Sequence, residues 1–355
     1  MLFHGQYYVC SESVTSANMP VVEQELDEGI LLENKNKDRL TMSINLNVLR
    51  DKAVRPDLQT LAASVAGASQ GNAADQATLC GAMIWASFSA PAAIPAVFDT
   101  ICRTQIGLET KYPDVVSAAV ALPEAFWKQF EETLVGPEAG YDATSITVAV
   151  AGLSVALDEG YAALSEEAAL CHPGSDNAEG KSIPPMISLT NLGEYPDGSL
   201  ARELLSMWVD NGFDPEVLDR DAIGLSGLSP AMRYLNTRIL QMHDTWHLVA
   251  GYQTTSLHEM AISAFQLAQF GHNYSAMFLT TVCTMSYLRQ PQGFVLLLQN
   301  LSEAWVHGSD APKFMAIEWE QDWHMNIDEV RAKHGIAPFA GGFPADLLEQ
   351  LSQAS

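Results

Sequence analysis

Hydrophobic residues recur with helical spacing through the second half of the chain. The Ser-Pro pair at 229–230 is typical of a helix start, and Gly251 is typical of a helix end. Apolar residues cover more than one face of the segment between them, which predicts a central and largely buried helix. Ser256 and Glu259 have the spacing of a capping box, so a second helix is expected to open there and to end near Gly271.

The rest of the chain is also expected to be mainly helical, with one exception. Segment 40–49 alternates apolar and polar residues, which indicates a strand or an amphipathic edge. The stretch 172–185 is rich in Pro, Gly and Ser and is the clearest loop or boundary. Helices are expected at 199–208, 275–288, 291–307 and 317–334, after an Ala-rich, helix-like region at 57–170. The predicted fold class is therefore all-α.

The two neighbouring helices concentrate residue types that bind metals. His243 and His247 are four residues apart, so they lie one turn apart on the same helix face, and Asp244 lies beside them. Glu259 follows Gly251 and is expected to come from the second helix. Neutral imidazoles and carboxylates are ligands of divalent metals such as zinc. These four side chains are therefore candidate metal ligands, with Asp244 alternatively a carboxylate that orients a histidine.

Each candidate ligand also has a structural interpretation. Glu259 could serve only as the partner of Ser256 in the capping box. The two histidines could be buried and hydrogen-bonded by Asp244 and nearby carbonyl groups. The His-Asp-x-x-His spacing is one substitution from the zincin motif, but aspartate is a carbon shorter than the glutamate that acts as the base there. HD-type phosphohydrolases need a separate upstream histidine and a later aspartate, and the upstream candidates His4 and His172 have unsuitable contexts. The chain also lacks a set of basic residues that would bind phosphate.

Charge and composition narrow the function classes. The formal net charge is −25, from 18 Lys and Arg against 43 Asp and Glu, which argues against nucleic acid and against a polybasic membrane anchor. The 5 cysteines form no CxxC pair, which indicates a reducing compartment without a disulfide framework. Two uncharged stretches, 76–98 and 260–288, contain prolines or polar residues, so buried core helices are expected rather than membrane spans, with a membrane-facing surface as the alternative. The first residues show no signal sequence, so the protein is expected to be bacterial and cytoplasmic.

His243-Asp244-x-x-His247, followed by eleven residues and Glu259, resembles the signature of the Coq4 family of ubiquinone biosynthesis proteins. Segment 192–205 (LGEYPDGSLARELL) resembles the family's Leu-Pro-x-Gly-Ser-Leu-Gly-Arg-x-Tyr segment, with Ala201 in place of the usual glycine. Further likenesses are Arg238 before the motif, Phe265 and Gln269 after it, and segments 303–308, 317–320 and 330–336. The resemblance covers residues 186–337, while the first 140 residues are longer than the family's ordinary N-terminal part.

The resemblance implies a divergent, N-terminally enlarged member with an all-α core around the helix that carries the metal motif. It divides the chain into a helical region at 1–140, a metal- and isoprenoid-binding domain at 141–340 and a tail at 341–355. The implied metal is zinc, with magnesium or another divalent ion as an alternative, and the implied ligands are His243, Asp244, His247 and Glu259.

The activity that the resemblance implies is oxidative decarboxylation of a prenylated 4-hydroxybenzoate-type precursor, which replaces the ring C1 carboxylate with a hydroxyl. Asp244 would then orient a histidine or relay a proton, and Arg238 would pair with a carboxylate. Two other functions stay open. The protein could be a non-catalytic scaffold that binds an isoprenoid or quinone lipid, or a soluble metal-dependent enzyme that acts on another small molecule.

The predicted partners follow from these alternatives. They are a prenylated aromatic or isoprenoid lipid, held in an apolar channel lined from 260–300, other quinone-biosynthesis enzymes, and a second copy of the chain in a homodimer. Nucleic acid is not expected as a partner, because of the charge. A lipid substrate also predicts peripheral association with the bacterial inner membrane through apolar contacts that salt does not weaken.

Overall fold

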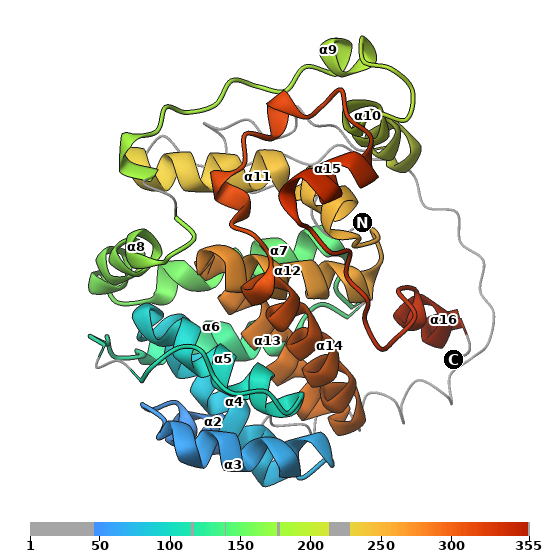
Figure 1. Cartoon of the computed structure of the whole chain (residues 1–355). Helices are drawn as coiled ribbons and strands as arrows, with labels where there is room; N and C mark the ends of the chain where they lie inside the picture. Colours follow the sequence, from blue (N-terminus) through green and yellow to red (C-terminus); the bar gives the residue numbers. More distant parts are fainter. Residues whose placement is uncertain (1–45, 115–116, 139, 176–177, 213–227, 354–355) are drawn as a thin grey trace, which may run out of the picture.

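The computed structural model describes residues 46–114, 117–138, 140–175, 178–212 and 228–353, and the regular elements in these ranges are helices without strands (Figure 1). The predicted all-α fold class is therefore confirmed. The α-helices are α2 (Leu46–Lys52), α3 (Leu58–Ser69), α4 (Ala73–Phe88), α5 (Ile94–Gln105), α6 (Glu124–Val135), α7 (Ala143–Gly152), α8 (Gly160–Cys171), α9 (Leu189–Gly193), α10 (Leu200–Asn211), α11 (Pro230–Ala250), α12 (Ser256–Phe270), α13 (Asn273–Arg289), α14 (Pro291–Asp310), α15 (Ile327–His334) and α16 (Leu347–Gln353). Short 3₁₀ turns are η1 (Pro91–Ala93), η2 (Leu153–Ala156), η3 (Ala178–Gly180), η6 (Phe314–Ala316) and η7 (Trp319–Gln321).

Helices α12, α13 and α14 form the centre of the molecule. α12 packs against both of the others, and all its residues from Leu257 to Phe270 are buried. Gly308 of α14 lies so close to α12 that a Cβ atom there would come within 2.5 Å of the Phe265 carbonyl oxygen. Such complete burial explains why α12 has no charged residue after Glu259, because an unpaired buried charge costs several kcal/mol.

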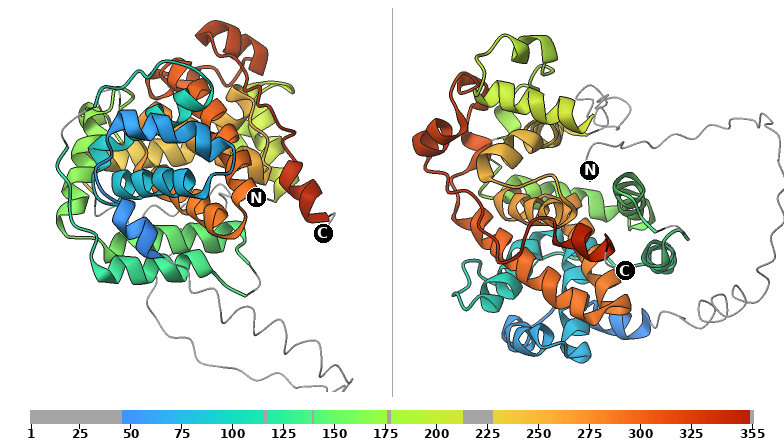
Figure 2. Two further views of the ribbon diagram at one scale, coloured as in Figure 1. Left: turned by 90° about the horizontal axis from the view of Figure 1, so that it is seen from below. Right: turned by 90° about the vertical axis from the view of Figure 1, so that its right-hand side faces the viewer.

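The helices of residues 46–105 form one end of the molecule and α10, α11 and α15 form the other, with the central helices between them (Figure 1). α3 and α4 lie side by side when the molecule is seen from below (Figure 2). α4 packs against α13, and α5 packs against α14. Both α4 and α5 are largely buried, so the uncharged stretch 76–98 does form core helices. One hydrophobic cluster runs through both halves, and the predicted domain boundaries stay a prediction.

Helix α11 begins and ends where the sequence predicts. The Ser229 side chain accepts a hydrogen bond from the Met232 N–H, and Pro230 occupies the first helical position. Gly251 ends the helix with a φ of +80°, and a Cβ atom at this glycine would lie 2.9 Å from the Pro338 side chain. The turn at Gly251 brings the first turn of α12 next to the last turns of α11.

Two predicted elements were wrong. Segment 40–49 is no strand over its described part, because α2 begins at Leu46 and buries Leu46 and Leu49, three residues apart, in the core. Residues 40–45 lie outside the described residues. The predicted helix at 317–334 is interrupted, because η7 precedes a new helix start where the Asn326 and Glu329 side chains form a capping box for α15.

None of the described helices is by itself both long and apolar enough to cross a membrane. Ser145–Ala156 and Gly160–Cys171 meet the length and composition criteria when taken as a pair, and a bend of 115° separates them.

Candidate metal centre

The candidate ligands come from the end of α11 and the start of α12. His243 and His247 lie in the last two turns of α11, and Glu259 lies in the first turn of α12. All three side chains are buried, and Glu259 is only 3% exposed. A buried carboxylate requires a positive partner or hydrogen-bond donors, because burial removes its solvation by water. The turn between the helices thus places one carboxylate against two imidazoles.

Three potential ligand atoms face one another in an almost regular triangle. The Nε2 atoms of His243 and His247 are 3.1 Å apart, and the Glu259 Oε2 atom lies 3.6 Å from the first and 3.5 Å from the second. A tetrahedral zinc ion with ligands at about 2.0–2.1 Å separates its ligand atoms by about 3.4 Å. The spacing of these two nitrogens and one oxygen therefore matches a shared zinc ion.

The Glu259 Oε2 atom supports the same interpretation. It is buried and has no hydrogen-bond partner among the described residues. A buried polar atom without a partner typically costs about 1–3 kcal/mol, and more when the group is charged. A cation between the three side chains would remove this cost, so the residues present fit a divalent metal.

Electrostatics at the site favours a positive charge between the three side chains. Burial acts to lower the pKa of His247, but the Glu259 carboxylate, with smaller contributions from Asp244 and the Tyr252 carbonyl, raises this pKa above its ordinary value. Burial likewise acts to raise the pKa of Glu259, and the imidazoles of His247 and His243 bring it well below its usual range. Glu259 is therefore ionised and stabilises either a proton on His247 or a metal cation.

The capping-box interpretation of Glu259 was wrong. The Ser256 N–H donates instead to the Glu349 carboxylate of α16 at 2.8 Å, and the residue before the helix, Thr255, provides no side-chain cap. A carboxylate from a distant part of the sequence thus accepts the backbone N–H at the start of α12. Glu259 contacts the two histidines.

Each histidine is also held by its second ring nitrogen. The His247 Nδ1 atom lies 3.2 Å from the Tyr252 carbonyl oxygen, and the His243 Nδ1 atom lies 2.7 Å from the Gln266 Nε2 atom. Metal-bound histidines commonly use this nitrogen to contact a carbonyl or carboxylate group. The sequence analysis missed both contacts. The available signal was a glutamine seven residues after Glu259, which places Gln266 on the same face of α12.

Asp244 is buried beside the histidines and is tied to α10. Its Oδ2 atom accepts a hydrogen bond of 2.7 Å from the Trp208 Nε1–H. One ligand atom each of Asp244, His243 and His247 lies within 4.8 Å of the others. This position suits a metal ligand and also suits a carboxylate that orients a histidine, so both roles of Asp244 stay predictions. Trp208, which lies 36 residues before Asp244, was missed by the sequence analysis.

Arg238 is engaged by a partner other than the candidate ligands. Its guanidinium forms a bidentate ion pair with Glu320, in which Nη2 lies 2.9 Å from Oε2, and Nη2 also contacts the Ile317 carbonyl oxygen at 3.4 Å. Burial acts to raise the pKa of Glu320, and the Arg238 guanidinium outweighs burial and lowers it. The pair attaches segment 317–320 to α11. Pairing of Arg238 with a substrate carboxylate stays a prediction.

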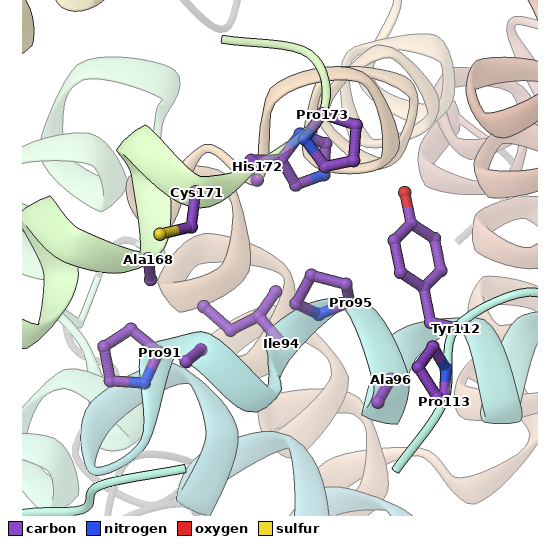
Figure 3. Close-up of a pocket in the computed structure, with 12 residues that line it drawn as sticks. Pro91, Ile94, Pro95, Ala96, Tyr112, Pro113, Ala168, Cys171, His172 and Pro173 are labelled. Carbon is purple, nitrogen blue, oxygen red and sulfur yellow. The ribbon is translucent and has the colours of Figure 1, made fainter. Parts of the chain in front are cut away.

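A cavity of about 200 Å³ lies between η1 and α5, the end of α8 and Tyr112 (Figure 3). His172 lines this cavity, and burial lowers the pKa of this histidine to about 4. The four candidate ligands do not line the cavity, and Gly271 is its only lining residue from 260–300. The predicted isoprenoid channel therefore does not coincide with this cavity and stays a prediction.

Residues 184–340 match the family model described as coenzyme Q (ubiquinone) biosynthesis protein Coq4. The chain carries a Coq4-family domain. The Coq4 match includes all four candidate ligands and lies inside the predicted region 141–340. The mitochondrial ubiquinone biosynthesis protein COQ4 homolog of Danio rerio is 26% identical over 152 residues, which make up 42% of this chain and 54% of that protein. The homolog of Drosophila sechellia is 31% identical over 107 residues, which make up 30% of this chain and 39% of that protein.

The chain spans about half the length of the curated Coq4 relatives it matches, with 54% of the Danio rerio protein and 56% of the Rattus norvegicus protein covered. A crystal structure of a Nostoc punctiforme protein, named for ubiquinone biosynthesis, has a TM-score of 0.45 and 24% identity. That likeness covers 60% of this chain and 97% of the other.

The predicted location in the bacterial cytoplasm or at the bacterial inner membrane was wrong. Coq4 relatives from Danio rerio, Rattus norvegicus and Talaromyces stipitatus are named mitochondrial proteins. The prediction depended on the composition of the first residues, which does not decide the compartment.

Proposed function

We propose that the chain is a metal-dependent enzyme of ubiquinone biosynthesis that removes the ring C1 carboxylate of a prenylated 4-hydroxybenzoate-type precursor and puts a hydroxyl in its place. The observation that carries this proposal is the convergence of the His243 Nε2, His247 Nε2 and Glu259 Oε2 atoms inside a Coq4-family domain. The family match supports the pathway, and the converging atoms support metal-dependent chemistry within it.

The donor set favours zinc as the metal. Magnesium prefers oxygen ligands and octahedral geometry, whereas imidazole nitrogens suit zinc. His243, His247 and Glu259 would supply three ligands, which is the number that catalytic zinc sites take from the protein while one position stays open for substrate or water. When bound, the ion supplies a Lewis acid that stabilises negative charge on a carboxylate or phenolate oxygen.

The residues around the ligands would control protons and water. Burial of the two histidines and Glu259 excludes bulk water, which strengthens the attraction between an anionic substrate group and the site. Asp244, fixed by the Trp208 hydrogen bond, is the carboxylate that could hold or move a proton beside the histidines. The balanced reaction consumes dioxygen, two electrons and two protons with the aromatic acid, and it releases the phenol, carbon dioxide and water.

A non-catalytic scaffold is the main alternative. In that function a prenylated aromatic or isoprenoid lipid and other quinone-biosynthesis enzymes would be binding partners, and the metal would only stabilise the fold. A soluble metal-dependent enzyme with another small substrate is a further alternative. Both predict that ubiquinone-precursor turnover does not depend on the charge of Glu259.

Glu259→Gln tests the proposal, because it keeps the side chain's size and removes its charge. The purified variant and the unaltered protein would be loaded with zinc and incubated with a short-chain prenylated 4-hydroxybenzoate, dioxygen and a reductant, with products measured by mass spectrometry. We expect the variant to form less than about 1% of the product, since removal of a direct metal ligand affects both metal binding and charge stabilisation. Glu349→Gln is the matched control, because Glu349 contacts the same helix through Ser256 and not through the histidines.

Complementation of a strain without its own Coq4-type protein distinguishes an enzyme from a non-catalytic scaffold. An enzyme would fail to restore ubiquinone synthesis when it carries Glu259→Gln and would restore it with Glu349→Gln. Full restoration by both variants would contradict catalysis at this site and would favour the scaffold.

A further inference from the structure

The two histidines of the metal centre differ in what holds their outer ring nitrogens. The His247 Nδ1 atom faces the Tyr252 backbone carbonyl, 3.2 Å away. A carbonyl oxygen only accepts hydrogen bonds, so Nδ1 of His247 carries a proton and the neutral ring presents its Nε2 lone pair to the site. The backbone contact thus selects the neutral tautomer of His247 that can bind a metal.

His243 has no such fixed arrangement. Its Nδ1 atom lies 2.7 Å from the Gln266 side-chain nitrogen, and an amide N–H can only donate. With that donation, the neutral His243 ring carries its proton on Nε2, which points at the His247 Nε2 atom 3.1 Å away. A protonated Nε2 cannot bind a metal, and the Glu259 Oε2 atom beside it has no hydrogen-bond partner among the described residues.

A half turn of the Gln266 amide reverses this arrangement. The amide oxygen and nitrogen have nearly the same size, so the turn changes the hydrogen bond without changing the packing. The oxygen then accepts a hydrogen bond from the His243 Nδ1–H, and the Nε2 lone pair becomes available. Gln266 is only 4% exposed, so bulk water does not compete for this contact.

We propose that Gln266 is a positioning residue whose amide oxygen accepts a hydrogen bond from the His243 Nδ1–H when zinc is bound, so that the His243 Nε2 lone pair faces the metal. This inference rests on the proposed metal centre and adds a residue to it. Gln266 acts through His243 and has no contact with the metal. Contacts of this kind typically change metal affinity by about 10–100-fold when they are removed.

Zinc affinity of the purified full chain, measured by competition with a chromophoric chelator, tests the proposal with two substitutions. Gln266→Leu keeps a side chain of similar length and removes the acceptor, so we expect zinc to bind about 10–100-fold more weakly. Gln266→Glu only accepts hydrogen bonds from a neutral imidazole, which fixes the Nδ1–H tautomer, so zinc should bind at least as tightly as to the unaltered chain.

Gln269→Leu is the matched control on the same helix. The Gln269 amide donates to the Gly308 carbonyl at 2.6 Å and accepts from the Phe314 N–H at 3.0 Å, so backbone groups of other segments hold its side chain. This substitution should lower the melting temperature and leave the zinc affinity within about twofold, as expected of a structural contact alone. A long-range ¹⁵N NMR spectrum of the zinc-bound chain should also show the His243 proton on Nδ1.

The outcomes separate this inference from the metal centre itself. Unchanged zinc affinity in Gln266→Leu, or equal weakening in Gln266→Leu and Gln266→Glu, would overturn the role of Gln266 while zinc still binds. Failure of the unaltered chain to bind zinc at one equivalent would overturn the metal centre and this inference together.

Discussion

Two buried histidines in this molecule respond to burial in opposite ways. Burial lowers the pKa of His172 to about 4, and the charge of Lys313 acts in the same direction. His247 is buried even more completely, yet its pKa is raised because the Glu259 carboxylate, Asp244 and the Tyr252 carbonyl together outweigh burial. Burial without a nearby carboxylate therefore favours a neutral imidazole, and a carboxylate 3.5 Å away makes the ring part of a cation site.

The surroundings of His172 and His247 differ in the same way. The cavity beside His172 is lined mainly by prolines, alanines and other apolar groups (Figure 3). The His172 Nδ1 atom accepts a hydrogen bond from the Gly174 N–H at 3.1 Å, which is a local structural contact. The α11–α12 site instead brings carboxylates and imidazoles from two helices together, which is the arrangement that metals require.

Removing both site histidines gives the largest expected difference between the metal centre and His172. We expect His243→Ala combined with His247→Ala to abolish zinc binding at one equivalent, since two of the three converging ligand atoms are lost. His172→Ala, the control, should keep full zinc content. Inductively coupled plasma mass spectrometry after equilibration with zinc and gel filtration measures both.

Near-complete zinc content in the double variant would show that the metal lies elsewhere. Loss of zinc from His172→Ala alone, with the chain still folded by circular dichroism, would show that the distinction between the two histidines is wrong.

Local patterns predicted the helices that carry the site. Ser229 and Gly251 are the observed N-cap and C-cap residues of α11, because capping depends on neighbours within one turn. The four-residue spacing of His243 and His247 likewise placed both rings on one face of the helix, and the structure brings their Nε2 atoms together.

Contacts between distant segments could not be predicted in this way. The capping-box spacing predicted that Glu259 accepts the Ser256 N–H at the start of α12. Glu349, 93 residues beyond Ser256, accepts this N–H instead. The Arg238–Glu320 ion pair spans 82 residues, and no spacing rule relates them. Such contacts depend on how whole helices pack, which periodicity does not specify.

The pH dependence of stability should differ in sign between the two histidines. Unfolded His172 titrates near 6.5 and folded His172 near 4, so the stability that its neutral form contributes is complete above pH 6.5 and is lost as the pH falls toward 4. The loss amounts to about 3 kcal/mol at 1.36 kcal/mol per pKa unit. His172→Asn keeps an acceptor near Nδ1 and should remove this loss, as measured by urea unfolding of the zinc-free chain from pH 7 to pH 4.

Glu259→Gln should change the pH dependence of urea unfolding in the direction opposite to His172→Asn. The raised pKa of His247 means that its contribution is complete below pH 6.5 and is lost as the pH rises through the folded value. The unaltered zinc-free chain should therefore lose stability relative to Glu259→Gln as the pH rises above 6.5. Parallel pH profiles for the unaltered chain, His172→Asn and Glu259→Gln would contradict the opposite pKa shifts of His172 and His247.

The smallest expected effect concerns the hydrogen bond between Trp208 and Asp244. Trp208→Phe removes the N–H that Asp244 accepts at 2.7 Å and leaves a buried carboxylate oxygen without this donor, so we expect a loss of about 1–3 kcal/mol beyond the change in ring size. Trp246→Phe on α11 is the control, because the Trp246 Nε1 atom is buried and has no hydrogen-bond partner among the described residues. Urea unfolding gives both free energies, and zinc affinity should fall by about tenfold in Trp208→Phe, at the lower end of the range typical for a group that orients a ligand. Equal losses in the two variants would mean that the hydrogen bond stabilises neither the fold nor the position of Asp244.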